Sequence, residues 1–242
     1  MLTMPDLTDA RYLNEVGWFL YREKYGANYF GHSYAEERLA YSRMLLDEVL
    51  RYCGQDSKWL DGKTVVSVGC GCSGDLAVWP AAIKIAVDPL LYTYQKLGML
   101  LEDAPGTAKT VFLSVGGEDL PLLDECADLA VCRNSLDHML DPAHGLNQIW
   151  RILKPDGALF LSVDVGGQPT PDEPSVFSMP SLTSLLREHF DVSSLTEGHP
   201  PHDEWRPFSV RALARKKPAP GVSLDRDAVL RAYEASIDQP AR

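Results

Sequence analysis

The sequence predicts an α/β fold, in which a mostly parallel sheet carries helices on both faces. Short apolar runs alternate with helical patterns from Lys63 onward, as expected of successive βαβ units. A glycine-rich segment, residues 69–74, follows the first of these runs directly. Right-handed crossovers bring the carboxyl ends of such strands to one edge of the sheet, which is where ligands bind in this class of fold.

The central elements are expected in a regular order. Five buried strands are predicted at 64–68, 84–87, 110–113, 127–132 and 158–163. One helical face separates the second and third strands, and another separates the fourth and fifth. The residues of these two faces are Leu90, Tyr94, Leu97 and Leu101, and then Leu146, Ile149, Trp150 and Leu153. A further helix around Leu182 precedes two last strands, at 190–195 and 208–214.

The two ends of the chain differ from this core. Residues 1–60 read as helical, with an apolar stripe at Tyr12, Val16, Phe19 and Leu20, a second helix from Ser33 to about Gly54, and an aromatic segment, 25–31, between them. Residues 217–242 begin as a linker and include a helix at about 225–236, which could dock on the core or on a second subunit. We therefore expect a helical N-terminal cap (1–60), a core (61–216) and a C-terminal tail (217–242).

Composition narrows the class of partner. The chain has 242 residues, which suits one α/β domain with additions, and its net charge of −11 counts against nucleic acid and anionic membranes. No apolar run is long enough to cross a membrane, and no signal peptide is visible. The five cysteines are odd in number and favour reduced thiols in the cytoplasm. Cys70 and Cys72 have the wrong spacing for a zinc pair, so we expect no metal.

The loop after the first strand indicates a nucleotide-like cofactor. Gly69, Gly71 and Gly74 form a GxGxxG match, and Asp88 ends the second strand 19 residues after Gly69 (88 − 69 = 19). Both nicotinamide cofactors and S-adenosylmethionine satisfy this pair of features. A pyrophosphate needs a well-formed helix after the glycines, whereas Trp79-Pro80 interrupts that pattern here. A cofactor without phosphates is therefore favoured.

Five segments in the correct order resemble the class I S-adenosylmethionine-dependent methyltransferases, most closely the small-molecule group called type 11. The resemblance covers roughly residues 60–216 and implies a Rossmann-like seven-stranded sheet whose last strand is antiparallel. The matching segments are VVSVGCG (65–71), IAVDP (85–89), GEDLPL (117–122), CRNSLDH (132–138) and LNQIWRILKPDG (146–157).

The resemblance implies S-adenosyl-L-methionine as cofactor and assigns roles by position. The glycine-loop backbone faces the methionine part, Asp88 holds the ribose hydroxyls, and the next segments frame the adenine. Gly116 stands where relatives often carry Asp or Asn, so the adenine amino group is expected to be held differently here. The implied cofactor residues are Gly69, Cys70, Gly71, Asp88, Pro89, Gly117, Glu118 and Asn134.

Catalytic and substrate residues are less strongly marked, because in-line methyl transfer needs only alignment and, for some acceptors, a base. His138 lies just past the fourth strand and is the candidate base, and a histidine packing under the pocket is the alternative. Tyr29 of the aromatic segment, with His199 and His202 between the last two strands, could contact substrate. A loop such as the one carrying those histidines is more often solvated surface, and a divalent metal site is the least favoured reading of it.

The sequence thus predicts methyl transfer to a small polar metabolite or natural-product intermediate, with oxygen favoured as acceptor. One alternative is a nicotinamide-dependent oxidoreductase. Its Tyr-x-x-x-Lys signature occurs only at Tyr92 and Lys96, on the wrong side of the site. The other is a methyltransferase-like binding module that has lost catalysis. A monomer and a homodimer remain equally open.

Overall fold

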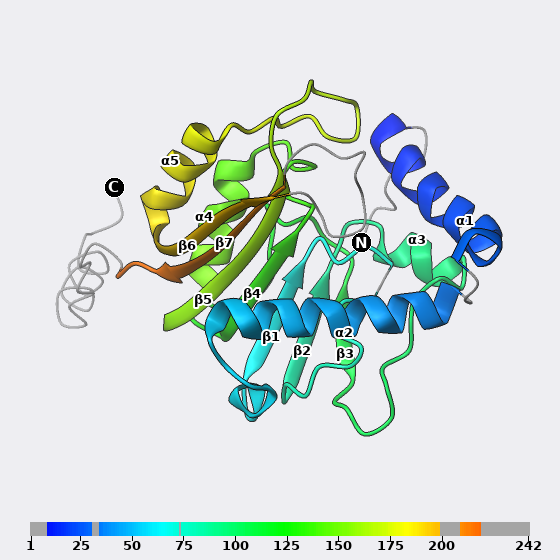
Figure 1. Cartoon of the computed structure of the whole chain (residues 1–242), viewed down its shortest axis with the longest axis horizontal. Coiled ribbons are helices and arrows are strands. Elements are labelled where there is room, and N and C mark those ends of the chain that lie inside the picture. The colour runs from blue at the N-terminus through cyan, green and yellow to red at the C-terminus, as the bar shows by residue number, and fades with distance from the viewer. Residues whose placement is uncertain (1–8, 31–33, 73, 199–208, 219–242) are drawn as a thin grey trace, which may run out of the picture.

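A computed structural model describes residues 9–30, 34–72, 74–198 and 209–218. The protein is built on a seven-stranded sheet in the order β3-β2-β1-β4-β5-β7-β6 (Figure 1). The first five strands pair in parallel, and β7 runs antiparallel to both of its neighbours. This confirms the predicted sheet. The strands are β1 (Thr64–Val68), β2 (Ile83–Val87), β3 (Thr110–Leu113), β4 (Ala127–Arg133), β5 (Leu153–Asp164), β6 (Phe190–Gly198) and β7 (Ser209–Lys216).

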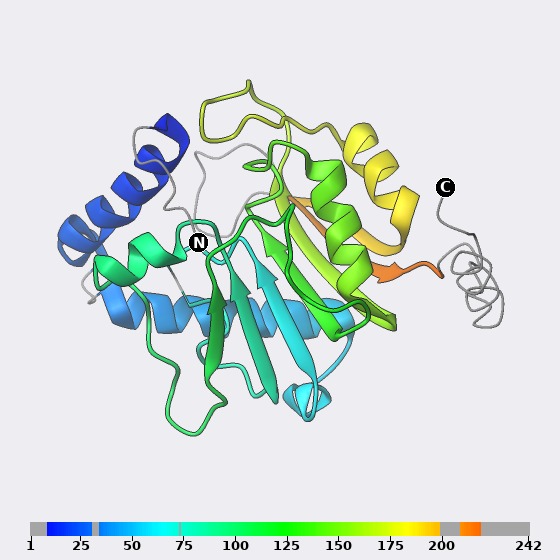
Figure 2. The same cartoon turned by 180° about the vertical axis from the view of Figure 1, so that it is seen from behind.

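Helices cover both faces of the sheet (Figures 1 and 2). One face carries α2, and the opposite face carries α4 and α5. A third group of buried side chains joins α1 to α3 and to the glycine loop. The helices are α1 (Ala10–Phe30), α2 (Tyr34–Cys53), α3 (Leu91–Lys96), α4 (Pro142–Ile152) and α5 (Met179–His189), with a short 3-10 helix at Ser57–Leu60.

The buried strand β1 shows why its sequence is mainly apolar, with Ser67 donating its hydroxyl to Asp75 Oδ2 at 3.0 Å. All five of its residues are buried, and successive side chains point to opposite faces. Val65 packs with Leu45 and Val49 of α2, whereas Val66 packs on the other side with Ile149 of α4. Because both faces are covered, neither has positions that tolerate polar side chains facing water.

Several predicted boundaries need correction. The aromatic segment is not a connection, because α1 continues through Phe30. The helix after β2 ends at Lys96, where Gly98 adopts a positive φ of 69°, so Leu97 is exposed rather than part of a buried face. Leu20 is also exposed, and β5 begins at Leu153 instead of residue 158.

Two other boundary predictions are confirmed, and two more concern residues that the structure does not describe. The second helix does end at Cys53, before Gly54 with its φ of 63°. Residues 75–78, between β1 and β2, form turns rather than a helix, as Trp79-Pro80 indicated. The start at Ser33 and the tail helix at 225–236 lie outside the described part of the chain.

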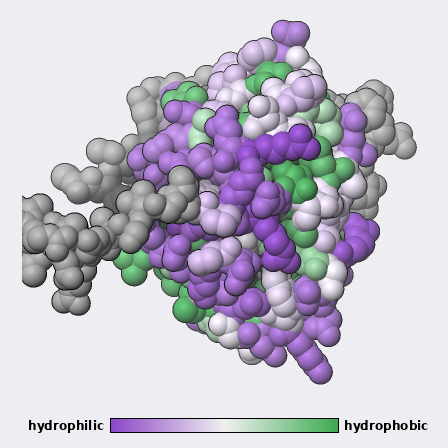
Figure 3. Space-filling view, turned by 90° about the vertical axis from the view of Figure 1, so that its left-hand side faces the viewer, coloured by the Kyte–Doolittle hydropathy of each residue, from purple (hydrophilic) through white to green (hydrophobic). Residues whose placement is uncertain are grey.

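The exposed surface agrees with the acidic composition. The face seen in Figure 3 is mostly hydrophilic, with apolar side chains in small groups. Within the described ranges, no helix combines the length and the apolar character needed to cross a membrane.

The sheet buries a charged side chain of β2 completely. Lys84 of β2 is completely buried, and its ammonium donates to Asp103 Oδ1 at 2.6 Å and to the carbonyl of Leu76 at 3.0 Å. Asp103 also accepts from the backbone N–H of Thr110 at 2.8 Å, at the start of β3. This ion pair therefore ties the connection before β3 to strand β2.

We predict that Asp103→Ala lowers the free energy of unfolding by about 3–5 kcal/mol, because it leaves the Lys84 ammonium buried without a counter-charge. Asp124→Ala is the matched control. It removes an exposed partner of Arg151 (2.6 Å), and is expected to cost less than about 1 kcal/mol. Urea denaturation measures both values. Similar losses in the two variants would contradict the role assigned to Lys84.

Candidate active site

The glycine loop lies where the carboxyl ends of β1 and β4 meet. Gly69 and Gly71 have positive φ values of 72° and 57°, a conformation that other residues rarely adopt. A Cβ atom placed on Gly69 would lie 2.1 Å from Cβ of Ser135, whose hydroxyl donates to the carbonyl of Val68 at 2.9 Å. Only glycine fits between the two loops at this position.

Asp88 holds this loop from the adjacent strand. One carboxylate oxygen accepts from the backbone N–H of Gly71 at 2.9 Å, and the other accepts from the N–H of Leu90 at 2.8 Å. Asp88 is buried, and this burial raises the pKa of its carboxyl group, while the two backbone hydrogen bonds oppose the rise. Each oxygen has one protein donor, so each retains acceptor capacity for a ligand.

The same region has the features of a cradle for an adenosine-type cofactor. Val16 of α1 packs with Cys70, Cys72 and Tyr94 beside the loop, and the rings of Phe19 and Tyr94 meet edge to face at 5.7 Å. The hydroxyl of Tyr94 is buried and has no hydrogen-bond partner in the described part of the chain. A glycine-lined turn, a buried acid and an unsatisfied phenol together fit a polar ligand without phosphates.

The remaining predicted cofactor residues lie at the same edge of the sheet. A Cβ on Gly117 would lie 2.4 Å from Met139 Cε and 2.8 Å from Val68 Cγ1, so the loop after β3 packs tightly here. Glu118 Oε1 accepts from the N–H of Leu140 at 3.0 Å.

Two further predicted residues have structural contacts of their own. Asn134 has a positive φ of 47°, and its N–H donates to the carbonyl of Ser162 at 2.7 Å. The carbonyl of Pro89 accepts from the Ser114 hydroxyl at 3.1 Å. The structure thus brings together the glycine loop, Asp88 and these flanking residues.

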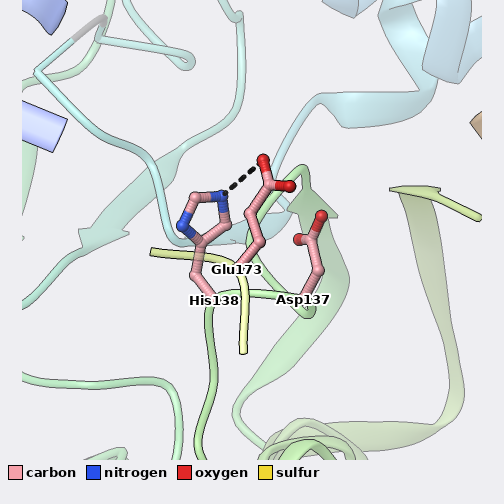
Figure 4. A group of neighbouring side chains, drawn as sticks. All are labelled: Asp137, His138 and Glu173. Atoms are coloured by element: carbon pink, nitrogen blue, oxygen red, sulfur yellow. Dashed lines mark ion pairs between the residues drawn. The ribbon is translucent and has the colours of Figure 1, made fainter. Parts of the chain in front are cut away.

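His138 belongs to a group of three side chains with Asp137 and Glu173 (Figure 4). His138 Nε2 lies 4.0 Å from Glu173 Oε1. Burial raises the pKa of Asp137 to about 6, although the nearby His138 opposes the rise. One potential ligand atom from each residue lies within 4.8 Å of the others. The base predicted from the sequence therefore has two acids beside it.

Glu15 of α1 is a site residue that the sequence analysis missed. Burial raises the pKa of its carboxyl group to about 7, and the proximity of His138 opposes that rise. Asp88, Asp172 and Glu173 raise it further, so Glu15 lies near acids of both the Asp88 region and the His138 group. One signal was present in the sequence: Glu15 falls three residues after Tyr12 and four before Phe19, on the apolar stripe of the helix.

A cavity of about 200 Å³ opens beside the His138 group, at the carboxyl end of β5. Acidic side chains from three separate chain positions contribute to it. The residues that line the cavity are Asp137, Asp164, Gly166, Gly167, Gln168, Glu173, Ser175 and Val176.

The predicted substrate contacts stay predictions. The backbone of Tyr29 lies in α1, but its side chain is outside the described part of the structure, as are His199 and His202. Two neighbouring tyrosines of α1 are exposed to solvent. Tyr21 and Tyr25 are 57 % and 37 % exposed and pair with one another, their ring centroids 4.7 Å apart. The α1 residues that pack on the glycine loop are instead Tyr12, Val16 and Phe19.

This strand order, with a glycine loop after β1 and an acid at the end of β2, defines the class I S-adenosylmethionine-dependent methyltransferase domain. Comparison with known families agrees. Residues 66–161 match the model of the type 11 family described as "Methyltransferase domain". S-adenosylmethionine is the cofactor of this class, and the cradle described above fits it.

One curated relative is the O-methyltransferase cnsE of Penicillium expansum, which is 26 % identical over 166 residues. The match covers 62 % of this chain and 60 % of that protein, so the chain spans well under two thirds of the relative's length.

Solved structures show the same fold at low sequence identity. The 1,6-didemethyltoxoflavin-N1-methyltransferase of Burkholderia thailandensis has a TM-score of 0.55 at 19 % identity, covering 89 % of this chain and 93 % of that one. It contains 1,6-didemethyltoxoflavin and S-adenosylhomocysteine. The cyclase SpnF has a TM-score of 0.54, also at 19 % identity, covering 74 % of this chain and 81 % of that one.

We predict that Glu15→Gln stabilises the protein at high pH. The folded-state pKa of about 7 lies above the ordinary value of 4.5, so stability falls as pH rises between these values and stays low above them. At pH 8 the variant should therefore be more stable by about 1–2 kcal/mol, and at pH 4 the difference should vanish. The charged groups that face Glu15 are His138, Asp88, Asp172 and Glu173.

Denaturation at several pH values measures this effect. Glu23→Gln removes an exposed acid from the same helix and should leave stability unchanged at every pH. A stability gain for Glu15→Gln that is equal at pH 4 and pH 8 would contradict the raised pKa.

Proposed function

We propose that the protein transfers a methyl group from S-adenosylmethionine to an oxygen atom of a small polar molecule. The observation that carries this proposal is Asp88, a buried acid hydrogen-bonded to the glycine loop at the end of β2. When bound, the cofactor supplies a methyl group on a positively charged sulfonium. The surrounding Asp88 and Glu15 suit a cation without phosphates.

The cofactor roles follow from the positions already described. The backbone of Gly69, Cys70 and Gly71 would receive the methionine part, and Asp88 would accept hydrogen bonds from the ribose hydroxyls. Pro89, Gly117 and Glu118 would frame the adenine. The backbone of Asn134, held in a positive-φ conformation next to β5, would lie near the methionine amine.

An oxygen acceptor must lose its proton, and His138 is the residue we propose as the base. It faces Glu15 and Asp88 on the cofactor side and Asp137 and Glu173 on the cavity side. The position of His138 beside these acids supports it as the base of the proposed transfer.

Two alternatives remain distinct from this proposal. A nicotinamide cofactor would need a helix N-terminus for its pyrophosphate, and the described residues between β1 and β2 form turns. A protein that binds the cofactor without transferring its methyl group is the second alternative. The cyclase name of SpnF illustrates that this fold does not dictate one chemistry.

Calorimetry tests which cofactor the protein binds. We expect the unmodified protein to bind S-adenosylmethionine and not NAD. Asp88→Ala should weaken S-adenosylmethionine binding by about 1–3 kcal/mol, because it removes hydrogen bonds to the ribose. Glu102→Ala, at an exposed acid in the loop before β3, is the control and should bind normally. NAD binding without S-adenosylmethionine binding would refute the proposal, provided that thermal melting shows folded protein.

The rate of methyl transfer tests the assignment of His138 as the base. His138→Ala should reduce methyl transfer by about 10²–10⁴-fold while S-adenosylmethionine affinity is kept, because only proton removal is lost. His144→Ala, an exposed histidine on α4, is the matched control and should retain full activity. Labelled S-adenosylmethionine with a metabolite extract supplies the assay and identifies the product. Full turnover of His138→Ala across pH 6–9 would remove the assignment.

A further inference from the structure

The charged side chains that line the cavity at the end of β5 are all acidic. Asp137, Asp164 and Glu173 contribute three carboxyl groups, and among the described residues that line it there is no lysine or arginine. Ser175 and Gln168 add only neutral polar groups. A space lined in this way has a negative potential and favours a cationic ligand.

Asp137 supplies a second and independent observation. Its side chain is only 3 % exposed, and Oδ1 has no hydrogen-bond partner among the described residues. A buried carboxylate oxygen without a donor is costly, and in native proteins such groups usually mark a ligand or water position. Because Asp137 lines the cavity, a donor placed in the cavity would satisfy this oxygen.

We propose that this cavity binds a protonated amine of the methyl acceptor, with Asp137 and Glu173 as its carboxylate partners. The proposal rests on the proposed function and extends it, because it makes the substrate an amine that also carries the hydroxyl to be methylated. The His138 imidazole, 4.0 Å from Glu173, would then face that hydroxyl from the side of the cofactor.

The geometry favours an ammonium group over a metal ion. Metal bonds of about 2.1 Å hold neighbouring tetrahedral ligands roughly 3.4 Å apart. His138 Nε2 and Glu173 Oε1 are 4.0 Å apart, and the group as a whole spans up to 4.8 Å. Hydrogen bonds of about 2.8 Å from a tetrahedral ammonium reach acceptors roughly 4.6 Å apart, which matches the wider spacing.

The cavity volume agrees with an organic ligand. At roughly 30 Å³ for each water molecule, about 200 Å³ corresponds to six or seven waters, which is far more than one bare ion occupies. A compact aromatic or aliphatic amine fills such a space, and the apolar Val176 and glycines beside the acids accept its carbon skeleton.

The test compares ligands that differ in one charge. Tyramine is paired with 4-ethylphenol, and benzylamine with benzyl alcohol, in NMR titrations of the protein saturated with S-adenosylhomocysteine. We expect each amine to bind at least about tenfold more tightly than its neutral partner. Saturation with S-adenosylhomocysteine is measured first, so that failure of the cofactor assignment is seen separately from failure of the amine site.

Variants that remove one carboxylate charge show which acids bind the amine. Glu173→Gln lies in a loop and should reduce amine affinity about fivefold or more without changing the neutral ligands. Asp137→Asn should do the same, with its thermal melting recorded because the side chain is buried. Asp172→Asn is the matched control: its carboxylate accepts from the Thr170 hydroxyl and does not line the cavity, so affinities should stay within about twofold.

Three results would overturn the proposal. One is equal affinity for the charged and neutral members of each pair. Another is no amine binding up to about 10 mM in protein that binds S-adenosylhomocysteine. The third is tight binding of Mn²⁺ that depends on Asp137 and Glu173 and displaces the amines, which would identify the group as a metal site.

Discussion

The carboxylate of Asp88 is the constraint on which the rest of the site depends. It is buried at the end of β2, and its two oxygens accept from Gly71 and Leu90, so the loop after β1 and the turn before α3 share one anchor. Burial without those two donors would cost free energy and drive protonation. Asp88 therefore fixes the glycine loop through the N–H of Gly71, and this hydrogen bond opposes the rise in pKa that burial causes at the Asp88 carboxyl group.

From this anchor the site extends in two directions that meet at His138. On one side, α1 brings Glu15 and Val16 over the glycine loop, and on the other the segment after β5 brings Glu173. The acids that gather here come from α1, β2, and the segments after β4 and β5. Part of the net charge of −11 is thus concentrated around a cavity, where it is suited to cationic ligands.

The sequence predicted the sheet well because its signals are local. The mainly apolar run at 64–68, the glycines that follow it and the acid at 88 are each recognised from neighbouring residues in the sequence. Contacts between residues far apart in the chain could not be predicted from such local patterns. The roles of Glu15 and Glu173 depend on where α1 and a loop fold back onto the sheet edge, and no spacing in the chain encodes that proximity. Lys84 was likewise placed on its strand correctly, but its burial depends on Asp103, 19 residues away.

The position of strand β7 between β5 and β6 affects how the sheet forms while the chain is being synthesised. This strand is the last described strand of the chain, yet it lies between β5 and β6 and pairs with both along most of its length. During synthesis, the sheet therefore has a gap until residue 216 has left the ribosome. Until then β5 and β6 present unpaired edges, which are prone to intermolecular pairing. These edges thus stay open to intermolecular pairing on the ribosome until β7 has been made and can fold between them.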